Sequence, residues 1–318
     1  RTLQAKRRMA ILLAVMDRDV RPLQQKIEVL LEGETEVWIY PDIPDPEQVE
    51  MAVLWKHPKG LFRELPELKL VSSLGAGVEH LLEDSDLPEG LNISRIVDEA
   101  LSCSMRNYVL MTVLSIQRSF RFMLENQRER SWVKPDPVER SLRIGILGMG
   151  ELGGAIARTL RDLSFEVWGY SRHPKKIKGV HCMNANGTTA ADFAAQVNFL
   201  VCLLPATPET EGILNSELFA RMPAGSFLIN VARGAHLVEP DLVEAIKSGQ
   251  IKEAYLDVFQ EEPLPLNHPF WLYPEIVITP HVASITNQNN AAAIIAENYR
   301  RLKRGEQLLY EVDRRKGY

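Results

Sequence analysis

GILGMGELG, residues 145–153, is the stretch of this sequence that decides the fold. A mostly apolar run, Leu142 to Leu147, leads into it, and a helix-like stretch, Ala155 to Leu163, comes after it. A strand, a tight glycine turn and a helix in this order form the setting that a dinucleotide pyrophosphate needs. A glycine turn alone is a common feature of proteins, but with both flanks in place the stretch predicts a dinucleotide-binding unit.

Three glycines of this turn have separate expected tasks. Gly148 allows the sharp turn, Gly150 leaves room for phosphate groups, and Gly153 lets the helix pack close to the strand. The N–H groups and the positive dipole end of the next helix then face the anion. We therefore expect the three glycines, with Glu151 and Leu152 between them, to contact a cofactor.

The residues after the second strand of this unit indicate which dinucleotide is bound. That strand spans Phe165 to Tyr170. NAD-binding units usually place an acidic residue about 20 residues beyond the glycines, where it holds the ribose 2′-OH. Here the place reads Ser171-Arg172-His173-Pro174-Lys175-Lys176, and an arginine can hold a 2′-phosphate in a bidentate pair. We predict that Ser171 and Arg172 select NADPH, with NADH as second choice; the alternative is a solvated basic turn.

The composition is that of an ordinary two-domain enzyme. The chain has 318 residues, of which 45% are hydrophobic and 25% charged. A net charge of −5 argues against nucleic acid or an anionic membrane as partner, and no apolar run is long enough to span a bilayer. The three cysteines are far apart, which suits the reducing cytoplasm and shows no metal-ligand spacing. Met9 to Met16 is short and is typical of a buried strand rather than a signal peptide.

The order of apolar runs predicts an α/β fold with two doubly wound parallel-sheet domains. A flavodoxin-like substrate-binding domain would comprise residues 1–103 and 285–318, and a Rossmann dinucleotide-binding domain, residues 104–284, would be inserted into it. A long helical pattern, Ser104 to Arg130, would cross between them, and Asn290 to Leu302 would return. The expected strands are 11–15, 37–40, 51–55, 70–74 and 93–97 in the first domain, and 143–147, 166–170, 199–203, 227–230, 253–256 and 276–279 in the second.

Charged groups come after three of the strands in the second domain. Arg233 lies just beyond one strand, Glu262 lies in the loop after the next, and His281 stands closely after a third. Ligand-contacting groups of open α/β sheets lie at such strand ends, where an arginine can hold a carboxylate and a histidine beside an acid can transfer protons. Each residue alone has a plain alternative: a surface ion pair for Arg233, a solvated loop for Glu262 and a structural role for His281.

Several motifs in one order resemble the D-isomer-specific 2-hydroxyacid dehydrogenase family over nearly the whole chain. They are the glycine fingerprint, Leu203-Leu204-Pro205-Ala206-Thr207-Pro208-Glu209-Thr210, Asn230-Val231-Ala232-Arg233-Gly234, Asp257-Val258 with Glu262-Pro263 shortly after, and Thr279-Pro280-His281. The resemblance implies that Arg233, Glu262 and His281 are the catalytic set; Glu262 is chosen over Glu261 because it directly precedes Pro263. It also implies a homodimer through the cofactor domain, and cofactor contacts at Leu204, Pro205, Thr210, Val231, Ala232 and Asp257.

Within the family the chain looks like the glyoxylate/hydroxypyruvate reductase branch. The supporting pieces are Ala52-Val53-Leu54-Trp55-Lys56, Ser73-Leu74-Gly75-Ala76-Gly77-Val78-Glu79-His80 and Val312-Asp313-Arg314-Arg315-Lys316-Gly317-Tyr318. The resemblance implies that Trp55 forms a pocket wall and that Gly75, Ala76 and Gly77 bind the substrate carboxylate through their backbone; Trp55 as a simple core residue is the alternative. Asn107 stands where relatives often have an acidic residue, and the basic N-terminal extension has no obvious match.

The combined pattern predicts reduction of a small 2-oxo acid such as glyoxylate or hydroxypyruvate. Arg233 would bind the carboxylate and polarise the keto oxygen, NADPH would deliver hydride, and His281, supported by Glu262, would donate the proton. Two alternatives stay open: a family member for a bulkier acid such as phosphoglycerate, and a dinucleotide-sensing corepressor. The basic turn at Ser171-Arg172 weighs against the first, and the net charge of −5 weighs against the second.

Overall fold

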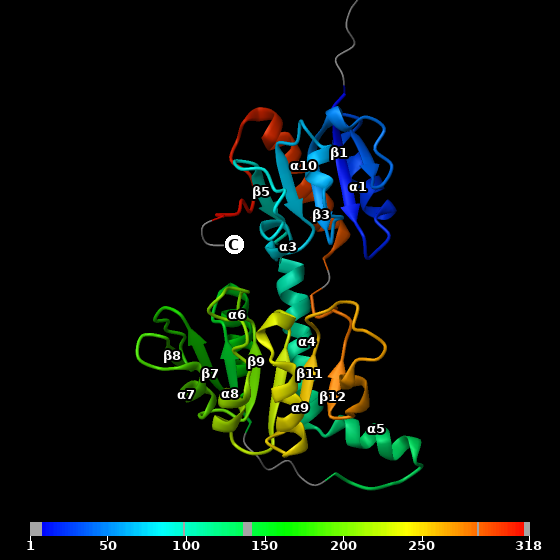
Figure 1. Cartoon of the computed structure of the whole chain (residues 1–318). Coiled ribbons are helices and arrows are strands. Elements are labelled where there is room, and N and C mark those ends of the chain that lie inside the picture. Colours follow the sequence, from blue (N-terminus) through cyan, green and yellow to red (C-terminus); the bar gives the residue numbers. More distant parts are fainter. Residues whose placement is uncertain (1–7, 98, 136–141, 285, 315–318) are drawn as a thin grey trace, which may run out of the picture. The chain divides into compact units, whose positions relative to one another are not determined.

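Two separate parallel sheets organise the residues that the structure, a computed structural model, describes: 8–97, 99–135, 142–284 and 286–314 (Figure 1). The chain divides into unit 1, with Arg1–Leu101 and Thr286–Tyr318, and unit 2, with Ser102–Ile285. Unit 2 is therefore inserted between the two segments of unit 1. Most of the basic N-terminal extension and the end of the C-terminal motif, residues 315–318, lie outside the described residues.

Unit 1 holds a five-stranded parallel sheet with the order β2-β1-β3-β4-β5. This is the strand order of flavodoxin-like doubly wound sheets. Its strands are β1 (Ala10–Val15), β2 (Glu36–Ile39), β3 (Val49–Trp55), β4 (Leu70–Ser73) and β5 (Asn92–Arg95). Its helices are α1 (Arg21–Leu31), α2 (Leu61–Glu64), α3 (Glu79–Leu82) and α10 (Gln288–Arg304), with a 3₁₀ turn, η1 (Pro46–Gln48).

Both faces of the unit 1 sheet are buried. Ile11 and Leu13 of β1 pack in one cluster with residues of α1 and α10, such as Ile27 and Ile295. Leu12, which points to the opposite face, packs in a second cluster with residues of α2 and α3. A strand that is covered on both faces must be apolar throughout, which is why β1 can be recognised in the sequence.

Unit 2 holds a seven-stranded parallel sheet with the order β8-β7-β6-β9-β10-β11-β12. This is the Rossmann order with one further strand at its edge, so the predicted fold class is confirmed. Its strands are β6 (Arg143–Leu147), β7 (Glu166–Ser171), β8 (His181–Asn184), β9 (Phe199–Cys202), β10 (Ser226–Asn230), β11 (Ile251–Leu256) and β12 (Ile276–Ile278). Its helices are α4 (Glu99–Gln117), α5 (Phe120–Arg128), α6 (Glu151–Asp162), α7 (Ala190–Ala194), α8 (Ser216–Arg221) and α9 (Glu239–Lys247), with the 3₁₀ turns η2 (Gly234–His236) and η3 (Pro269–Leu272).

The strands of unit 2 are also covered on both faces. In β9, Leu200 and Cys202 pack against residues of α7, α8 and α9. Phe199 and Val201 alternate with them and pack against residues of α4 and α6. Because helices cover both faces, a ligand reaches this sheet at the carboxyl ends of its strands.

Two elements differ from the expectation drawn from the sequence. β8 is not predicted, because its residues are exposed or half-buried and form no apolar run. The single helix predicted over 104–130 is wrong: α4 ends at Gln117 and α5 begins at Phe120. Ser119 between them has a φ of +50°, a left-handed conformation that no glycine or proline signals in the sequence.

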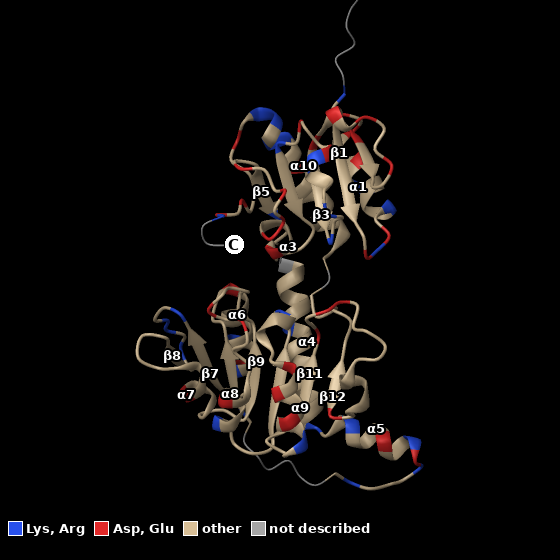
Figure 2. Cartoon of the chain, viewed as in Figure 1, with Lys and Arg blue, Asp and Glu red and all other residues tan. Residues whose placement is uncertain are grey.

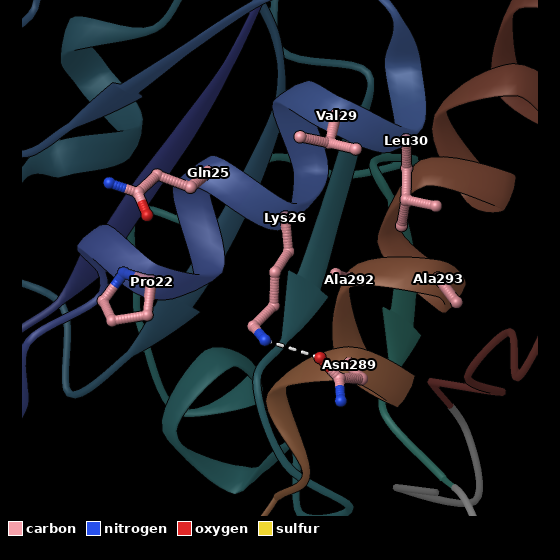
Figure 3. Close-up of a pocket in the computed structure, with 8 residues that line it drawn as sticks. All are labelled: Pro22, Gln25, Lys26, Val29, Leu30, Asn289, Ala292 and Ala293. Carbon is pink, nitrogen blue, oxygen red and sulfur yellow. Dashed lines mark hydrogen bonds between the residues drawn. The ribbon is translucent and has the colours of Figure 1, made fainter.

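Helices α1 and α10 lie side by side in unit 1 and border a shallow hollow (Figure 3). Lys26 Nζ of α1 donates a hydrogen bond to Asn289 Oδ1 of α10 (2.5 Å). The hollow is lined by Pro22, Gln25, Lys26, Val29, Leu30, Asn289, Ala292 and Ala293. None of the predicted site residues lines it, so the hollow is separate from the candidate active site.

Candidate active site

The predicted site residues of unit 2 lie in the segments that follow six neighbouring strands of the seven-stranded sheet. One residue near the carboxyl end of each of these strands forms a row across the sheet. Register pairs join neighbouring strands along this row. Because the strands are parallel, the segments that continue from the row all leave the sheet at one edge. The row consists of Tyr170, Leu147, Cys202, Asn230, Leu256 and Ile278, and the segments after it carry Arg172, the glycine turn, Leu204, Arg233, Glu262 and His281.

His281 and Glu262 form a direct pair at this edge. His281 Nδ1 lies 2.8 Å from Glu262 Oε2, and the two side chains are 33% and 17% exposed. The other carboxylate oxygen, Oε1, accepts a hydrogen bond from Phe259 N (3.0 Å). Since an ionised carboxylate only accepts hydrogen bonds, Nδ1 carries the hydrogen, and Nε2 is the ring atom that can exchange a proton with a ligand.

Asp257 fixes the loop that carries His281. Asp257 is 1% exposed, and its carboxylate accepts hydrogen bonds from Val282 N (2.9 Å) and Ala283 N (2.8 Å). It also accepts one from Thr279 Oγ1 (2.5 Å), so donors on both sides of His281 converge on it. His281 has a φ of +54°, which is strained for a non-glycine residue and needs such support. Asp257 therefore positions the histidine; its expected contact with the cofactor stays a prediction.

Tyr108 of α4 extends the same network. Its hydroxyl lies 2.7 Å from Thr279 Oγ1, and Tyr108 is the donor because Thr279 donates its own hydrogen to Asp257. Burial raises the pKa of Tyr108 to about 12, the charge of Asp257 adds to this, and the hydrogen bond with Thr279 opposes it. The tyrosine is therefore protonated at neutral pH and holds Thr279 in place.

Two side chains hold the backbone of Arg233. Asn230 Nδ2 donates a hydrogen bond to Arg233 O (2.9 Å), and Arg233 N donates one to His236 Nδ1 (3.2 Å). His236 is fully buried, and its Nε2 donates to Pro205 O (3.1 Å), because Nδ1 is the accepting atom. Arg233 Nη1 donates to Ala232 O (2.6 Å). The backbone of Arg233 is thus held by the last residue of β10 and the last residue of η2.

The segments of Arg233 and Glu262 meet at a glycine. A Cβ atom on Gly234 would lie 1.9 Å from Phe259 C, so no other residue fits there. Phe259 N is also the donor to Glu262 Oε1. The close backbone contact between Gly234 and Phe259 therefore links the segment that presents the arginine to the segment that orients the glutamate.

The glycine turn has the geometry of a phosphate cradle. Gly148 has a φ of +102°, and a Cβ on Gly153 would lie 1.9 Å from Gly148 O, so the helix could not pack as it does. Gly150 is the N-cap of α6, and a Cβ there would meet nothing within 4 Å. Open space thus lies in front of a helix N-terminus whose first N–H groups have no partner within the helix. These features fit a dinucleotide pyrophosphate, with Glu151 and Leu152 in the first turn.

The end of β7 carries the basic turn. Ser171 is buried, and its hydroxyl donates a hydrogen bond to His173 O (2.7 Å), which shapes the turn. Arg172 is exposed, and its Nη2 lies 3.9 Å from Glu209 Oε1. Basic residues gather on the loop between β7 and β8 (Figure 2): Arg172, Lys175, Lys176 and Lys178. This charge fits a 2′-phosphate.

The other predicted cofactor contacts lie in the segments after β9 and β10. Thr210 Oγ1 donates to Pro205 O (2.7 Å), the carbonyl that also binds His236. Leu204 is half-buried against the core, and Val231 and Ala232 are buried directly after β10. Their contacts with a cofactor stay predictions.

Among the predicted substrate-binding residues of unit 1, Gly75 packs against Trp55. A Cβ on Gly75 would lie 2.8 Å from Trp55 Cζ3, so the glycine allows the backbone to pack on the indole ring. The carbonyls of residues 75–77 all accept hydrogen bonds within unit 1, from Ile96 N, Arg95 Nη1 and Ser73 Oγ respectively. The loop is therefore well fixed, but its contact with a substrate stays a prediction.

Four positioning residues have no role predicted from the sequence. Asn230, His236, Thr279 and Tyr108 all act through hydrogen bonds to the segments of Arg233 and His281. Asn230 has a usable signal, because it is a polar residue that ends an apolar strand. Tyr108 has none, because it lies 171 residues from its partner in the sequence.

Comparisons with known proteins agree on one family. The family model described as D-isomer specific 2-hydroxyacid dehydrogenase, NAD binding domain, matches residues 110–283. Glyoxylate/hydroxypyruvate reductase A of Serratia proteamaculans is 41% identical over 280 residues, which cover 86% of this chain and 89% of the relative. The corresponding protein of Photorhabdus laumondii is 40% identical with the same coverage.

Solved structures give the same picture. A D-isomer specific 2-hydroxyacid dehydrogenase from Xanthobacter autotrophicus Py2, in complex with NADPH and MES, has a TM-score of 0.87 at 39% identity and covers 98% of this chain and 100% of its own. An NADPH-dependent glyoxylate/hydroxypyruvate reductase from Sinorhizobium meliloti, in complex with NADP and sulfate, has a TM-score of 0.87 at 33% identity with the same coverage.

Proposed function

The chain belongs to the D-isomer-specific 2-hydroxyacid dehydrogenase family of NAD(P)-dependent oxidoreductases, and on this premise we propose that it reduces glyoxylate or hydroxypyruvate with NADPH. The observation that carries the proposal is the 2.8 Å pair of His281 and Glu262 at the sheet edge that also holds the dinucleotide turn. The names of the relatives support this choice of substrate and cofactor.

In the proposed reaction His281 is the proton donor. With Nδ1 bound to Glu262, the imidazolium presents Nε2–H to the keto oxygen, and the carboxylate stabilises the charged ring. The bound reduced nicotinamide supplies the hydride for the keto carbon. When the proton has left, Glu262 still holds the neutral ring in its orientation through Nδ1–H.

Arg233 is proposed to bind the substrate carboxylate and polarise the keto oxygen. A guanidinium offers donors in a planar fork that matches a carboxylate, and its charge stabilises negative charge that develops on the oxygen. The bonds from Asn230 and His236 that fix the Arg233 backbone support this assignment, because a clamp must be rigid to select a reactive orientation.

We propose that Trp55, Gly75, Ala76 and Gly77 of unit 1 bind the substrate. We assign residues 1–103 and 285–318 to substrate binding and residues 104–284 to the cofactor. Gly75 N already donates to Ser73 Oγ at 3.4 Å, so the N–H groups of Ala76 and Gly77 are the better donors for a carboxylate. Trp55 is proposed as the pocket wall that favours short substrates.

We also propose that the protein is a homodimer and that it is located in the cytoplasm. Helix α5 has no buried residue and exposes several large apolar side chains, which supports an interface on unit 2. The cysteines Cys103, Cys182 and Cys202 are free, and free thiols are typical of proteins in a reducing compartment. Among the described residues, no helix has the length and apolar character that a membrane span requires.

Absorbance of the reduced nicotinamide tests the proposal directly. The assay uses NADPH and then NADH, each with glyoxylate and with hydroxypyruvate. We expect fast oxidation of NADPH and little use of NADH. Near-normal turnover by both Arg233→Ala and His281→Ala would overturn the assigned roles. Turnover only with a bulkier 2-oxo acid would favour the phosphoglycerate-type alternative, and dinucleotide binding without turnover would favour the sensor.

A further inference from the structure

An acidic residue faces the arginine that is proposed to select NADPH. Arg172 Nη2 lies 3.9 Å from Glu209 Oε1, and the two side chains are 75% and 66% exposed. The pair is therefore an ion pair in solvent without a direct hydrogen bond, and such a pair is weak enough to be broken by a ligand. Glu209 is not among the residues assigned to the active site.

Arg172 and Glu209 come from the segments on either side of the glycine turn. Strands β7, β6 and β9 are neighbours in that order, and the turn comes after the central one. Arg172 lies directly after β7, whereas Glu209 lies in the loop after β9. A Cβ on Gly148 would lie 2.7 Å from Leu203 O, so this loop begins in contact with the turn. Glu209 thus reaches Arg172 across the edge where the dinucleotide is proposed to lie.

The loop of Glu209 is held by several bonds. Thr207 N donates to Thr210 Oγ1 (3.0 Å), and Thr210 N donates to Thr207 O (3.0 Å), which closes a tight turn around Glu209. Gly212 N donates to Ala235 O (2.9 Å) and ties the end of the loop to η2. A hydrogen bond from the Thr207 side chain, and to a smaller extent the charge of Arg172, lower the pKa of the Glu209 carboxyl. The Glu209 carboxyl is therefore ionised at neutral pH.

We infer that Glu209 is a specificity-determining residue, whose carboxylate competes with the 2′-phosphate of NADP for Arg172 and so moderates the preference for NADP over NAD. A 2′-phosphate offers the guanidinium the same kind of anionic oxygen that Glu209 offers. It must displace that carboxylate or lie close to it, and both cost binding free energy. NAD has an uncharged hydroxyl there and meets no such competition. The inference rests on the proposed use of NADPH and adds a residue that limits it.

Removal of the charge gives a measurable difference between two small probes. The probes are 2′,5′-ADP, which carries the 2′-phosphate, and 5′-AMP, which lacks it. We expect Glu209→Gln to tighten 2′,5′-ADP binding about two- to tenfold, the size of an exposed charge interaction at close range. The affinity for 5′-AMP changes by less than about twofold, and at about 1 M salt the gain is largely screened.

Titration calorimetry on the full-length protein measures these affinities without any turnover. Glu211→Gln is the matched control, because it removes the same charge two residues away from a side chain that is not paired with Arg172. Arg172→Ala and the double variant with Glu209→Gln complete a cycle. If Glu209 acts by competing for Arg172, the gain from Glu209→Gln shrinks in the Arg172→Ala background.

The outcomes separate this inference from the proposed function. An unchanged 2′,5′-ADP affinity in Glu209→Gln, an equal gain in Glu211→Gln, or an equal shift for 5′-AMP would overturn the role of Glu209 alone. An Arg172→Ala variant that binds 2′,5′-ADP normally would overturn both the arginine's proposed role and this inference. If the protein shows the expected binding pattern but reduces neither oxo acid, the inference about Glu209 holds and the proposed reaction is wrong.

Discussion

At the scale of single residues, the charge of Glu262 carries a clear prediction. Glu262→Gln keeps a side chain of the same shape but removes the charge that stabilises the His281 imidazolium across 2.8 Å. The glutamine amide can also favour the wrong ring tautomer. We expect kcat to fall about a hundredfold or more, with little change in the KM for NADPH, because acid–base catalysis contributes at this level. Steady-state kinetics of glyoxylate reduction measure both constants.

Glu261 supplies the control for this substitution. It is the adjacent residue, and it is exposed, whereas Glu262 is the one that contacts His281. Glu261→Gln is expected to keep nearly normal kcat. Equal losses in the two variants would show that general loop charge, rather than the ion pair with His281, supports the reaction.

The catalytic candidates could be named from the sequence, but their supports could not. Arg233, Glu262 and His281 each stand in a recognisable motif after an apolar strand. The residues that hold them contact them through the fold: Tyr108 reaches Thr279 from α4, and His236 reaches Pro205 in another loop. A sequence pattern identifies the residues that come directly after a strand, whereas such contacts depend on which segments the sheet brings side by side.

At the scale of elements, the contact between β6 and α6 depends on Gly153. In Gly153→Ala the new Cβ would lie 1.9 Å from Gly148 O, a backbone atom that cannot move without shifting the turn. We expect a lower melting temperature, in line with overpacking costs of about 1–3 kcal/mol. We also expect the affinity for NADPH to fall at least about tenfold, which is a loss of about 1.4 kcal/mol of binding free energy. Calorimetry of unfolding and of NADPH binding tests both.

Gly150→Ala separates the two effects of this change. Its Cβ would meet nothing within 4 Å, so the protein should fold with nearly unchanged stability. NADPH binding should still weaken, because the methyl group enters the space proposed for the phosphates. A Gly150→Ala variant that binds NADPH as tightly as the original protein would contradict the proposed position of the pyrophosphate.

Most strands could be predicted because parallel strands are buried on both faces. β6 has the bounds predicted for it, residues 143–147, and the other predicted strands differ from the structure by one or two residues at their ends. β8 could not be predicted, since an edge strand with half-exposed residues lacks such a run. The break at Ser119 was missed for a different reason: apolar periodicity continues through it, and only the backbone conformation changes.

At the scale of the whole molecule, the exposed apolar side chains of α5 lead to a prediction about the oligomeric state. Phe120 and Leu124 lie four residues apart on this helix and are 49% and 38% exposed. If they belong to the proposed dimer interface, a Phe120→Glu and Leu124→Glu double variant places two charges in it and yields monomers. Light scattering after gel filtration measures the mass. Val29→Glu changes an exposed apolar side chain of α1 in unit 1; it is the control and should stay dimeric. A double variant with the mass of the original protein would refute an interface on α5.

The insertion of unit 2 leaves unit 1 with two chain segments, and Glu50 joins them. Glu50 is buried in β3; its Oε1 lies 2.6 Å from Lys69 Nζ in the first segment, and its Oε2 lies 2.6 Å from Lys303 Nζ in α10 of the second. Burial acts to raise the pKa of the Glu50 carboxyl, but the hydrogen bonds and charges of Lys303 and Lys69 outweigh it and leave that pKa below its ordinary value. Glu50 therefore couples the C-terminal helix to the sheet through a charge that depends on pH.

The lowered pKa of Glu50 makes the stability of unit 1 depend on acidity. A group with a depressed folded-state pKa stabilises the fold above its unfolded pKa of about 4.3, and this contribution is lost as pH falls below that value. Glu50→Gln should thus destabilise unit 1 by about 1–2 kcal/mol at neutral pH, while the stabilities of the two proteins converge as the pH falls through the lowered folded-state pKa of Glu50. Calorimetry can follow unit 1 separately if the two units unfold in separate transitions. Glu47→Gln, close in sequence but exposed, controls for net charge. A constant stability difference between Glu50→Gln and the original protein across this pH range would mean that Glu50 acts through packing, not through its charge.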